Sequence, residues 1–284
     1  MNPNIAKITV IGQDRKGVIA RITNYLFENG ANIEDIEQKV IKNLFQMIMK
    51  IDISELQISQ DQLAEGLKAL EKELKMDIKT ELFSEKTKPD MVIMVTREDH
   101  CPKAILDSWK QGELNVNIPL MIGSCKDLKY LADMHQIPFY VFDNPDRVKN
   151  ETAILEFLKN FEIDLIVLAR YMKILTPDFV WRYDNQIINI HPSLLPAFPG
   201  AEAYRQAFEK GVRIAGATAH FVTMDLDKGP IIAQESFRLE PNMGLEQVKS
   251  EGQAAEVRAL LKAIKLFLDD KLTIYWNKVH YKGE

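Results

Sequence analysis

The chain has 284 residues, of which 46% are hydrophobic and 27% charged, a composition typical of a soluble globular protein with two domains. Its net charge of −5 and pI of about 5.7 exclude nucleic acid and anionic membranes as expected partners. No apolar stretch approaches the roughly 18 residues of a membrane span, and the start does not resemble a signal peptide. The two cysteines, Cys101 and Cys125, are too few for a disulfide framework, so we expect them reduced in the cytoplasm.

Residues 1–83 are expected to form one α/β domain with the element order βαββαβ. Apolar alternation predicts the strands, and apolar residues at helical spacing predict two amphipathic helices. The expected elements are strand 8–11, helix 18–27, strands 33–41 and 44–53, helix 58–74 and strand 77–82. This order gives an antiparallel sheet with both helices on one side, which is the ferredoxin-like arrangement.

The polar, proline-containing segment 84–90 is expected to link this domain to a second one, residues 91–284. In the second domain, short aliphatic strands alternate with helical patterns, which predicts a doubly wound, mostly parallel, Rossmann-like sheet. The expected strands are 91–95, 118–122, 139–142, 163–168, 186–188, 216–222 and 231–233, and a long helix is expected over 245–268. Ligands of such sheets bind at the carboxyl ends of the strands.

Three polar side chains near strand ends form a candidate catalytic group. Asn189 and His191 lie two residues apart where an aliphatic strand ends, so both point to the same side of the sheet. Asp227 lies in a turn between two further strands, where it can reach His191. An amide donor, an imidazole and a carboxylate can polarise a carbonyl and move protons without a metal. Each of the three is also a common structural residue, so only their joint spacing favours catalysis.

Residues 91 to about 235 resemble the formyltransferase fold that uses 10-formyltetrahydrofolate. The resemblance is carried by the ordered segments 169–175, 188–196 and 226–232. It implies that Asn189, His191 and Asp227 are the catalytic residues. It also implies a folate pocket that is closed by the loop of Asp225 and lined, mainly through backbone groups, by Met172, Lys173, Ile174 and Leu175. Without the resemblance, the apolar residues of segment 172–175 would indicate ordinary strand-to-helix packing.

Residues 5–83 resemble an ACT domain, a small ferredoxin-like module that often binds amino acids. The similarity is carried by the turn 12–20, in which Gly17 permits close backbone approach and Val18 begins a helix with free amides. The resemblance implies a regulatory site for a small amino acid at Asp14, Gly17 and Val18; a purely structural turn is the alternative. It also implies pairing of edge strands between subunits, which would give a homo-oligomer, a tetramer.

An ACT domain in front of a formyl-folate domain resembles the formyltetrahydrofolate deformylase family over nearly the whole chain. This layout implies hydrolysis of 10-formyltetrahydrofolate to formate and tetrahydrofolate, which supplies formate for purine biosynthesis and balances the one-carbon folate pool. The folate is then the substrate, and no tightly bound cofactor is expected. Because the five histidines lack ligand spacing with cysteine or paired carboxylates, no metal site is expected either.

Two features separate hydrolysis from transfer of the formyl group. Where glycinamide ribonucleotide formyltransferases carry a Gly/Ser-rich phosphate loop, segment 96–102 has two carboxylates and no glycine, which disfavours a phosphorylated acceptor. Pro192, in contrast, stands where deformylases often have a second histidine. Transfer to an amine of the glycinamide ribonucleotide or sugar-nucleotide type therefore stays open, as does a folate or amino-acid sensor without catalysis. The roles of Arg97 and His100 stay open between function and structure.

Overall fold

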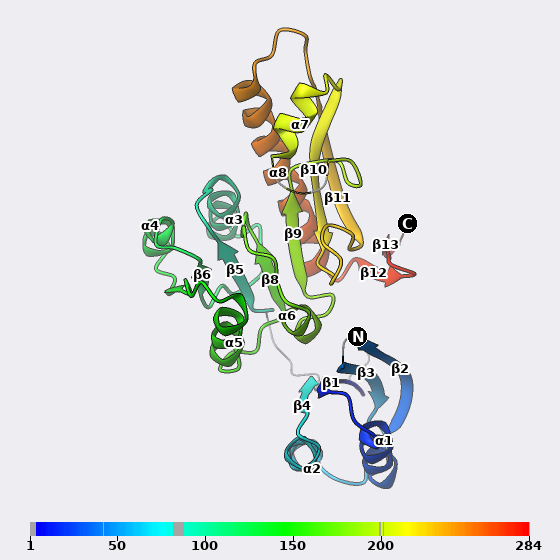
Figure 1. Ribbon diagram of the computed structural model, residues 1–284. Coiled ribbons are helices and arrows are strands. Elements are labelled where there is room, and N and C mark those ends of the chain that lie inside the picture. The colour runs from blue at the N-terminus through cyan, green and yellow to red at the C-terminus, as the bar shows by residue number, and fades with distance from the viewer. Residues whose placement is uncertain (1–3, 42, 82–87, 199, 201, 284) are drawn as a thin grey trace. The chain divides into compact units, whose positions relative to one another are not determined.

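The chain builds a four-stranded sheet in its first third and a seven-stranded sheet in the remainder, each in a unit of its own (Figure 1). The computed structural model describes residues 4–41, 43–81, 88–198, 200 and 202–283. The two units comprise Met1–Lys86 and Thr87–Glu284. Residues 84–87 of the predicted linker lie outside the described residues.

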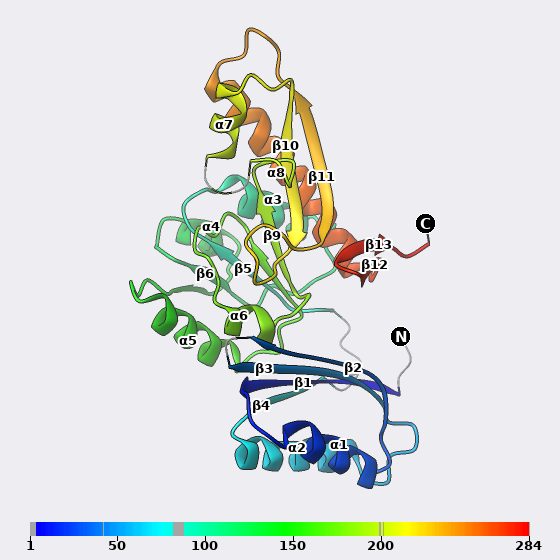
Figure 2. The same cartoon turned by 45° about the vertical axis from the view of Figure 1, so that its right-hand side comes forward.

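The first unit is the predicted ferredoxin-like domain. Its elements are β1 (Ile5–Gln13), α1 (Val18–Glu28), β2 (Asn32–Ile41), β3 (Leu44–Asp52), α2 (Gln60–Leu74) and β4 (Asp77–Glu81). The strands pair antiparallel in the order β2-β3-β1-β4, and both helices cover one face of the sheet (Figure 2). The βαββαβ order and the antiparallel sheet are confirmed.

Two boundaries of this unit differ from the prediction for local reasons. Strand β1 is longer than residues 8–11 because its pairing with β3 continues from Ile5 to Gln13. Helix α2 begins later than Ile58 because Ser59 forms a capping box. Its hydroxyl accepts from the Gln62 amide at 3.2 Å, and Gln62 Oε1 accepts from the Ser59 amide at 2.9 Å.

The second unit carries the predicted doubly wound sheet. Its elements are β5 (Met91–Val95), α3 (His100–Lys110), β6 (Met121–Gly123), α4 (Lys129–Met134), β7 (Phe139–Val141), α5 (Arg147–Leu158), β8 (Leu165–Leu168), α6 (Pro177–Arg182), β9 (Ile187–His191), α7 (Ala203–Glu209), β10 (Ile214–Phe221), β11 (Ile231–Arg238) and α8 (Leu245–Leu268). Strands β5 to β9 pair parallel, whereas β10 and β11 extend the sheet antiparallel. The mostly parallel architecture is therefore confirmed.

The strand order places a winding reversal next to the first strand of this unit. The order is β11-β10-β9-β8-β5-β6-β7, so the chain winds through β6 and β7 on one side of β5 and then through β8 and β9 on the other. Helices α3, α4 and α8 pack on one face of the sheet, and α5 and α6 pack on the opposite face. Ligands of such sheets bind at the carboxyl ends of the strands where the winding reverses.

Smaller differences from the predicted elements follow from backbone chemistry. Strand β6 starts at Met121, not at residue 118, because Pro119 has no amide to donate to a ladder. The hairpin of β12 (Leu272–Tyr275) and β13 (Lys278–Tyr281) was not predicted; its turn residues, Trp276 and Asn277, have φ of 51° and 57°. Among the described residues, no helix has both the length and the hydrophobicity needed to cross a membrane.

Candidate active site

A cavity of about 270 Å³ lies in the second unit beside the carboxyl ends of β8 and β9. Its walls come chiefly from residues 168–175, 189–192 and 220–227. The predicted catalytic residues line it, and so do the four predicted folate residues, Met172, Lys173, Ile174 and Leu175. Asp225 does not; its carbonyl oxygen instead accepts from the Lys228 amide and the Thr223 hydroxyl, which shapes the turn before Asp227.

Asn189 faces a histidine that the sequence did not single out. The antiparallel register of β9 and β10 makes Asn189 and His220 Cα partners, and the Asn189 amide nitrogen lies 3.2 Å from His220 Nε2. His220 Nδ1 donates to the Phe221 carbonyl at 2.8 Å, so Nε2 is the acceptor of the Asn189 amide. Burial lowers the pKa of His220, which keeps the ring neutral. This neutral ring therefore fixes the orientation of the Asn189 amide.

Asp227 lies between two imidazole rings. Its Oδ2 is 3.4 Å from His191 Nδ1, and its Oδ1 is 3.9 Å from His220 Nε2. The Gly200 amide also donates to Oδ2 at 3.4 Å. Asp227 has a left-handed φ of 56°, a conformation that aspartate tolerates, and its carboxylate is almost fully buried. The turn therefore directs the Asp227 carboxylate toward His191, as the sequence predicted.

The turn that carries Asp227 depends on a glycine two residues later. A Cβ added to Gly229 would lie 1.8 Å from the carbonyl oxygen of Phe221, so only glycine permits this approach. The same Phe221 carbonyl holds the Nδ1 proton of His220. The positions of Asp227 and His220 are therefore linked through one backbone group.

His191 has a hydrogen-bond acceptor at each ring nitrogen. Nδ1 faces the Asp227 carboxylate, and Nε2 lies 3.1 Å from the Phe198 carbonyl oxygen. Only the doubly protonated ring can donate at both positions. The group thus places an imidazole ring beside a carboxylate, with the Asn189 amide on the same strand face.

Thr218, a residue that sequence reasoning missed, fixes the loop after His191. This fully buried hydroxyl donates to the Ser193 carbonyl at 2.6 Å and accepts from the Leu195 amide at 3.0 Å. Gln234 donates to the same hydroxyl at 2.9 Å. The only sign of Thr218 in the sequence is that a polar residue interrupts an apolar strand.

A second missed residue, Thr96, holds the predicted folate segment at the end of β5. Its hydroxyl oxygen accepts from the Met172 amide at 3.0 Å. The chain turns into this segment at Arg170, which has a left-handed φ of 62°, and Met172 and Ile174 are more than half exposed. These side chains give the cavity an apolar wall. Arg97 does not line it and forms an exposed ion pair with Asp127 at 3.3 Å.

The predicted regulatory residues lie at the start of α1 in the first unit. Gly17 has a φ of 92° and is the N-cap of the helix. Val18 is buried in the core of this unit, so it can offer a ligand its backbone amide only. The side chain of Asp14 is exposed, and its amide donates to the Asn43 carbonyl at 2.9 Å.

Comparison with known proteins relates both units to characterised families. Residues 4–81 match the ACT domain family, and residues 90–264 match the formyl transferase family. The formyltetrahydrofolate deformylase of Synechocystis sp. is 36% identical over 277 residues, which cover 96% of each chain. The chain belongs to the formyltetrahydrofolate deformylase family.

Solved structures agree with membership of the deformylase family. The crystal structure of a formyltetrahydrofolate deformylase from Pseudomonas syringae pv. tomato is 31% identical, with a TM-score of 0.68 and coverage of 98% of this chain and 94% of that one. A glycinamide ribonucleotide transformylase from Symbiobacterium toebii is 32% identical, with a TM-score of 0.66. The match covers 70% of this chain and 97% of the transformylase, so the similarity to the deformylase extends over more of this chain.

Proposed function

We propose that this protein hydrolyses 10-formyltetrahydrofolate to formate and tetrahydrofolate. The observation that carries the proposal is the largely buried group of Asn189, His191, Asp227 and His220 on the wall of a partly apolar cavity. Membership of the deformylase family supports the same substrate and reaction. The protein is thus an enzyme of the hydrolase class.

The formyl oxygen is the atom on which negative charge develops. Asn189 offers it the second proton of an amide that His220 already orients. His191 offers the Nε2 proton that the Phe198 carbonyl accepts in the free protein, so the formyl oxygen takes the place of that carbonyl. Each such donor typically contributes on the order of 100-fold to the rate.

Asp227 is the group that receives the proton of the attacking water. Water adds to the formyl carbon, Asp227 takes one of its protons directly or through a second water, and the carbon–N10 bond breaks. N10 leaves with the proton that Asp227 took from the water, so the products are formic acid, which ionises to formate, and tetrahydrofolate. The interaction of Asp227 with His191 Nδ1 keeps the imidazolium in place throughout.

The folate ring is proposed to bind along segment 172–175, where backbone groups and the exposed Met172 and Ile174 form one wall. The loop of Asp225 acts through its neighbours Met224 and Leu226, which line the cavity, whereas Asp225 does not. Flat aromatic ligands fit such walls, in which a few polar groups fix the orientation.

The deciding experiment is the release of formate from 10-formyltetrahydrofolate with no amine present. The proposal expects formate and tetrahydrofolate in equal amounts over many turnovers. A protein that is active only after addition of an amine would instead be a formyltransferase, the reading that Pro192 keeps open. The carboxylates of Glu98 and Asp99 at the end of β5 favour hydrolysis, because they repel a phosphorylated acceptor.

The ACT domain is proposed to regulate this activity through a small amino acid that binds near Asp14, Gly17 and Val18. We also propose a homo-oligomer, a tetramer, in which the ACT domains pair, and formate supply to purine biosynthesis as the metabolic role. Formate release measured with and without glycine or methionine tests the regulation. An unchanged rate over the whole range of both amino acids would remove it. The predicted cytoplasmic location stays a prediction.

A further inference from the structure

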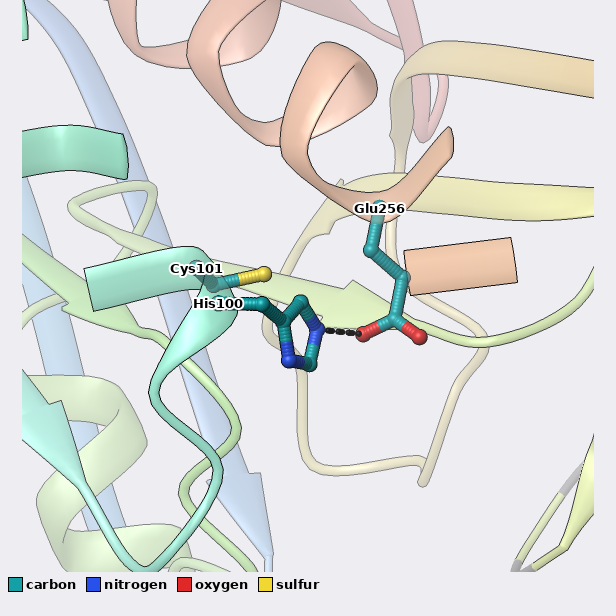
Figure 3. A group of neighbouring side chains, drawn as sticks. All are labelled: His100, Cys101 and Glu256. Carbon is teal, nitrogen blue, oxygen red and sulfur yellow. Dashed lines mark hydrogen bonds and ion pairs between the residues drawn. The ribbon is translucent and has the colours of Figure 1, made fainter. Parts of the chain in front are cut away.

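A second cluster of reactive side chains lies where α3 begins, against the middle of α8. His100 and Cys101 come from the first turn of α3, and Glu256 comes from α8 (Figure 3). His100 Nε2 lies 3.1 Å from Glu256 Oε2, and the Cys101 thiol points to the same place. One donor atom from each of the three residues lies within 4.8 Å of the other two. None of the three lines the cavity described above.

The three side chains have the ligand chemistry of a zinc-type cation. Thiolate, imidazole and carboxylate are the groups that bind Zn²⁺ in proteins, at about 2.0–2.3 Å. Two ligands of a tetrahedral zinc ion are therefore roughly 3.3–3.8 Å apart. His100 Nε2 and Glu256 Oε2 are already about that close, and a pair at the 4.8 Å limit of the cluster needs to approach by roughly 1 Å. Cys101 and Glu256 are each only 1% exposed, which excludes an ordinary solvated surface cluster.

The surroundings of the cluster fit such a site. Glu98 Oε2 lies 3.7 Å from the other ring nitrogen of His100, in the place where a carboxylate commonly supports a metal-bound histidine. The Tyr204 hydroxyl is buried and has no hydrogen-bond partner among the described residues. The Tyr204 hydroxyl lies beside Glu256 and thus adds a further oxygen to the surroundings of the cluster.

Arg170 is the competing cation at this place. Its Nε lies 3.5 Å from Glu256 Oε2, and its Nη2 lies 3.3 Å from Glu98 Oε1. The charges balance with a divalent cation, because the cation and Arg170 together offset the thiolate of Cys101 and the two carboxylates. Glu98 can keep Arg170 while Glu256 turns an oxygen to the metal.

We propose that His100, Cys101 and Glu256 form a binding site for a zinc-type divalent cation, which joins the start of α3 to α8. The proposed metal site is structural. Its ligands come from the two helices α3 and α8, whereas the candidate catalytic residues lie on β9 and in the turn of Asp227. Arg170 connects the proposed metal site with the candidate active site, because it pairs with Glu256 and also lines the cavity. Spacing along the chain gave no sign of this site because Glu256 lies 156 positions after His100.

The test is titration of the full-length, chelator-treated protein with Co²⁺, followed by the thiolate-to-cobalt charge-transfer absorption. One equivalent of Co²⁺ is expected to bind the wild-type protein, and Zn²⁺ is expected to displace it. The band should be lost in Cys101→Ser and should need at least tenfold more Co²⁺ in Glu256→Gln. Cys125→Ser is the matched control and should keep the band, because the Cys125 thiol donates to the Thr96 carbonyl instead.

Thermal unfolding supplies a second readout that does not depend on the absorption band. Zn²⁺ should raise the Tm of the wild-type protein and of Cys125→Ser, but not that of Cys101→Ser. Circular dichroism checks that each variant is folded. Folded wild-type protein that shows neither the band nor a Tm shift in excess metal would overturn the site and leave an ion-pair cluster. A band that survives Cys101→Ser would overturn it as well.

Discussion

The side-chain amide nitrogen of Asn189 lies 3.2 Å from Nε2 of His220, its Cα partner on the adjacent antiparallel strand. His220 in turn gives its Nδ1 proton to the Phe221 carbonyl. One residue that contacts the formyl group in the proposed mechanism is therefore oriented by another that does not. This makes His220 a positioning residue, and its contribution can be separated from that of Asn189.

Removal of the Asn189 amide should lower kcat by about 100-fold, because one donor to the developing oxyanion is lost. His220→Ala should lower kcat by roughly tenfold with little change in KM, since it only releases the amide. The double variant should be no slower than Asn189→Ala alone, because His220 acts through Asn189. Steady-state formate release from the four proteins measures this coupling. Fully additive losses would show that His220 acts by another route.

Replacement of Asp227 by asparagine should abolish turnover, with a loss on the order of 1,000-fold or more, because an amide cannot take the proton of the attacking water. The variant should still fold and bind folate, since asparagine has the same shape and also tolerates a left-handed φ. Formate release, circular dichroism and folate binding by fluorescence test the three statements. Near-normal activity in a folded variant would refute the role of Asp227.

The buried His220 should make the protein less stable in mild acid. Burial lowers its pKa in the folded state, whereas the unfolded chain has the ordinary value of about 6.5. The stability that the neutral ring contributes is present above about pH 6.5 and is lost as the pH falls, because the unfolded state then binds a proton that the folded state excludes. Tm measured from pH 8 to pH 5 should fall less steeply in His220→Gln. Parallel curves for the two proteins would contradict the assignment.

Alanine at position 229 should damage stability and activity together. The added Cβ would meet the Phe221 carbonyl at 1.8 Å, and the backbone shift that relieves this overlap should lower the free energy of unfolding by about 1–3 kcal/mol. The same shift moves the carbonyl that holds His220. Gly244→Ala is the matched control, since nothing lies within 4 Å of its added Cβ. Equal denaturant midpoints for the two variants would contradict this account.

The sequence predicted the two sheets because their signals are local. Residues 91–95 are a continuous aliphatic run, and every one of them is buried, as expected of a parallel strand with helices on both faces. The limits of the elements were less predictable. A capping box moved the start of α2, and the turn at Trp276 and Asn277 has left-handed φ without the Asn-Gly pair that usually indicates it.

The residues of the site that could be predicted are those that spacing and motifs indicate. Asn189 and His191 share a strand face by their two-residue spacing, and the structure brings Asp227 to 3.4 Å from His191. His220 and Thr218 were not predicted, because each lies within an apolar strand. Their roles depend on the register of β9 against β10 and on the path of the loop after His191. Register across strands is a property of the folded sheet, so one strand's sequence does not reveal it.

The pairing of β9 with β10 fixes the Asn189 amide before any ligand binds. The Asn189 amide belongs to the hydrogen-bonded frame of the sheet, so in the proposed mechanism it is aligned once, when the chain folds, and not again each time folate binds. The donor therefore needs no rearrangement of its strand when a bulky ring system enters the cavity.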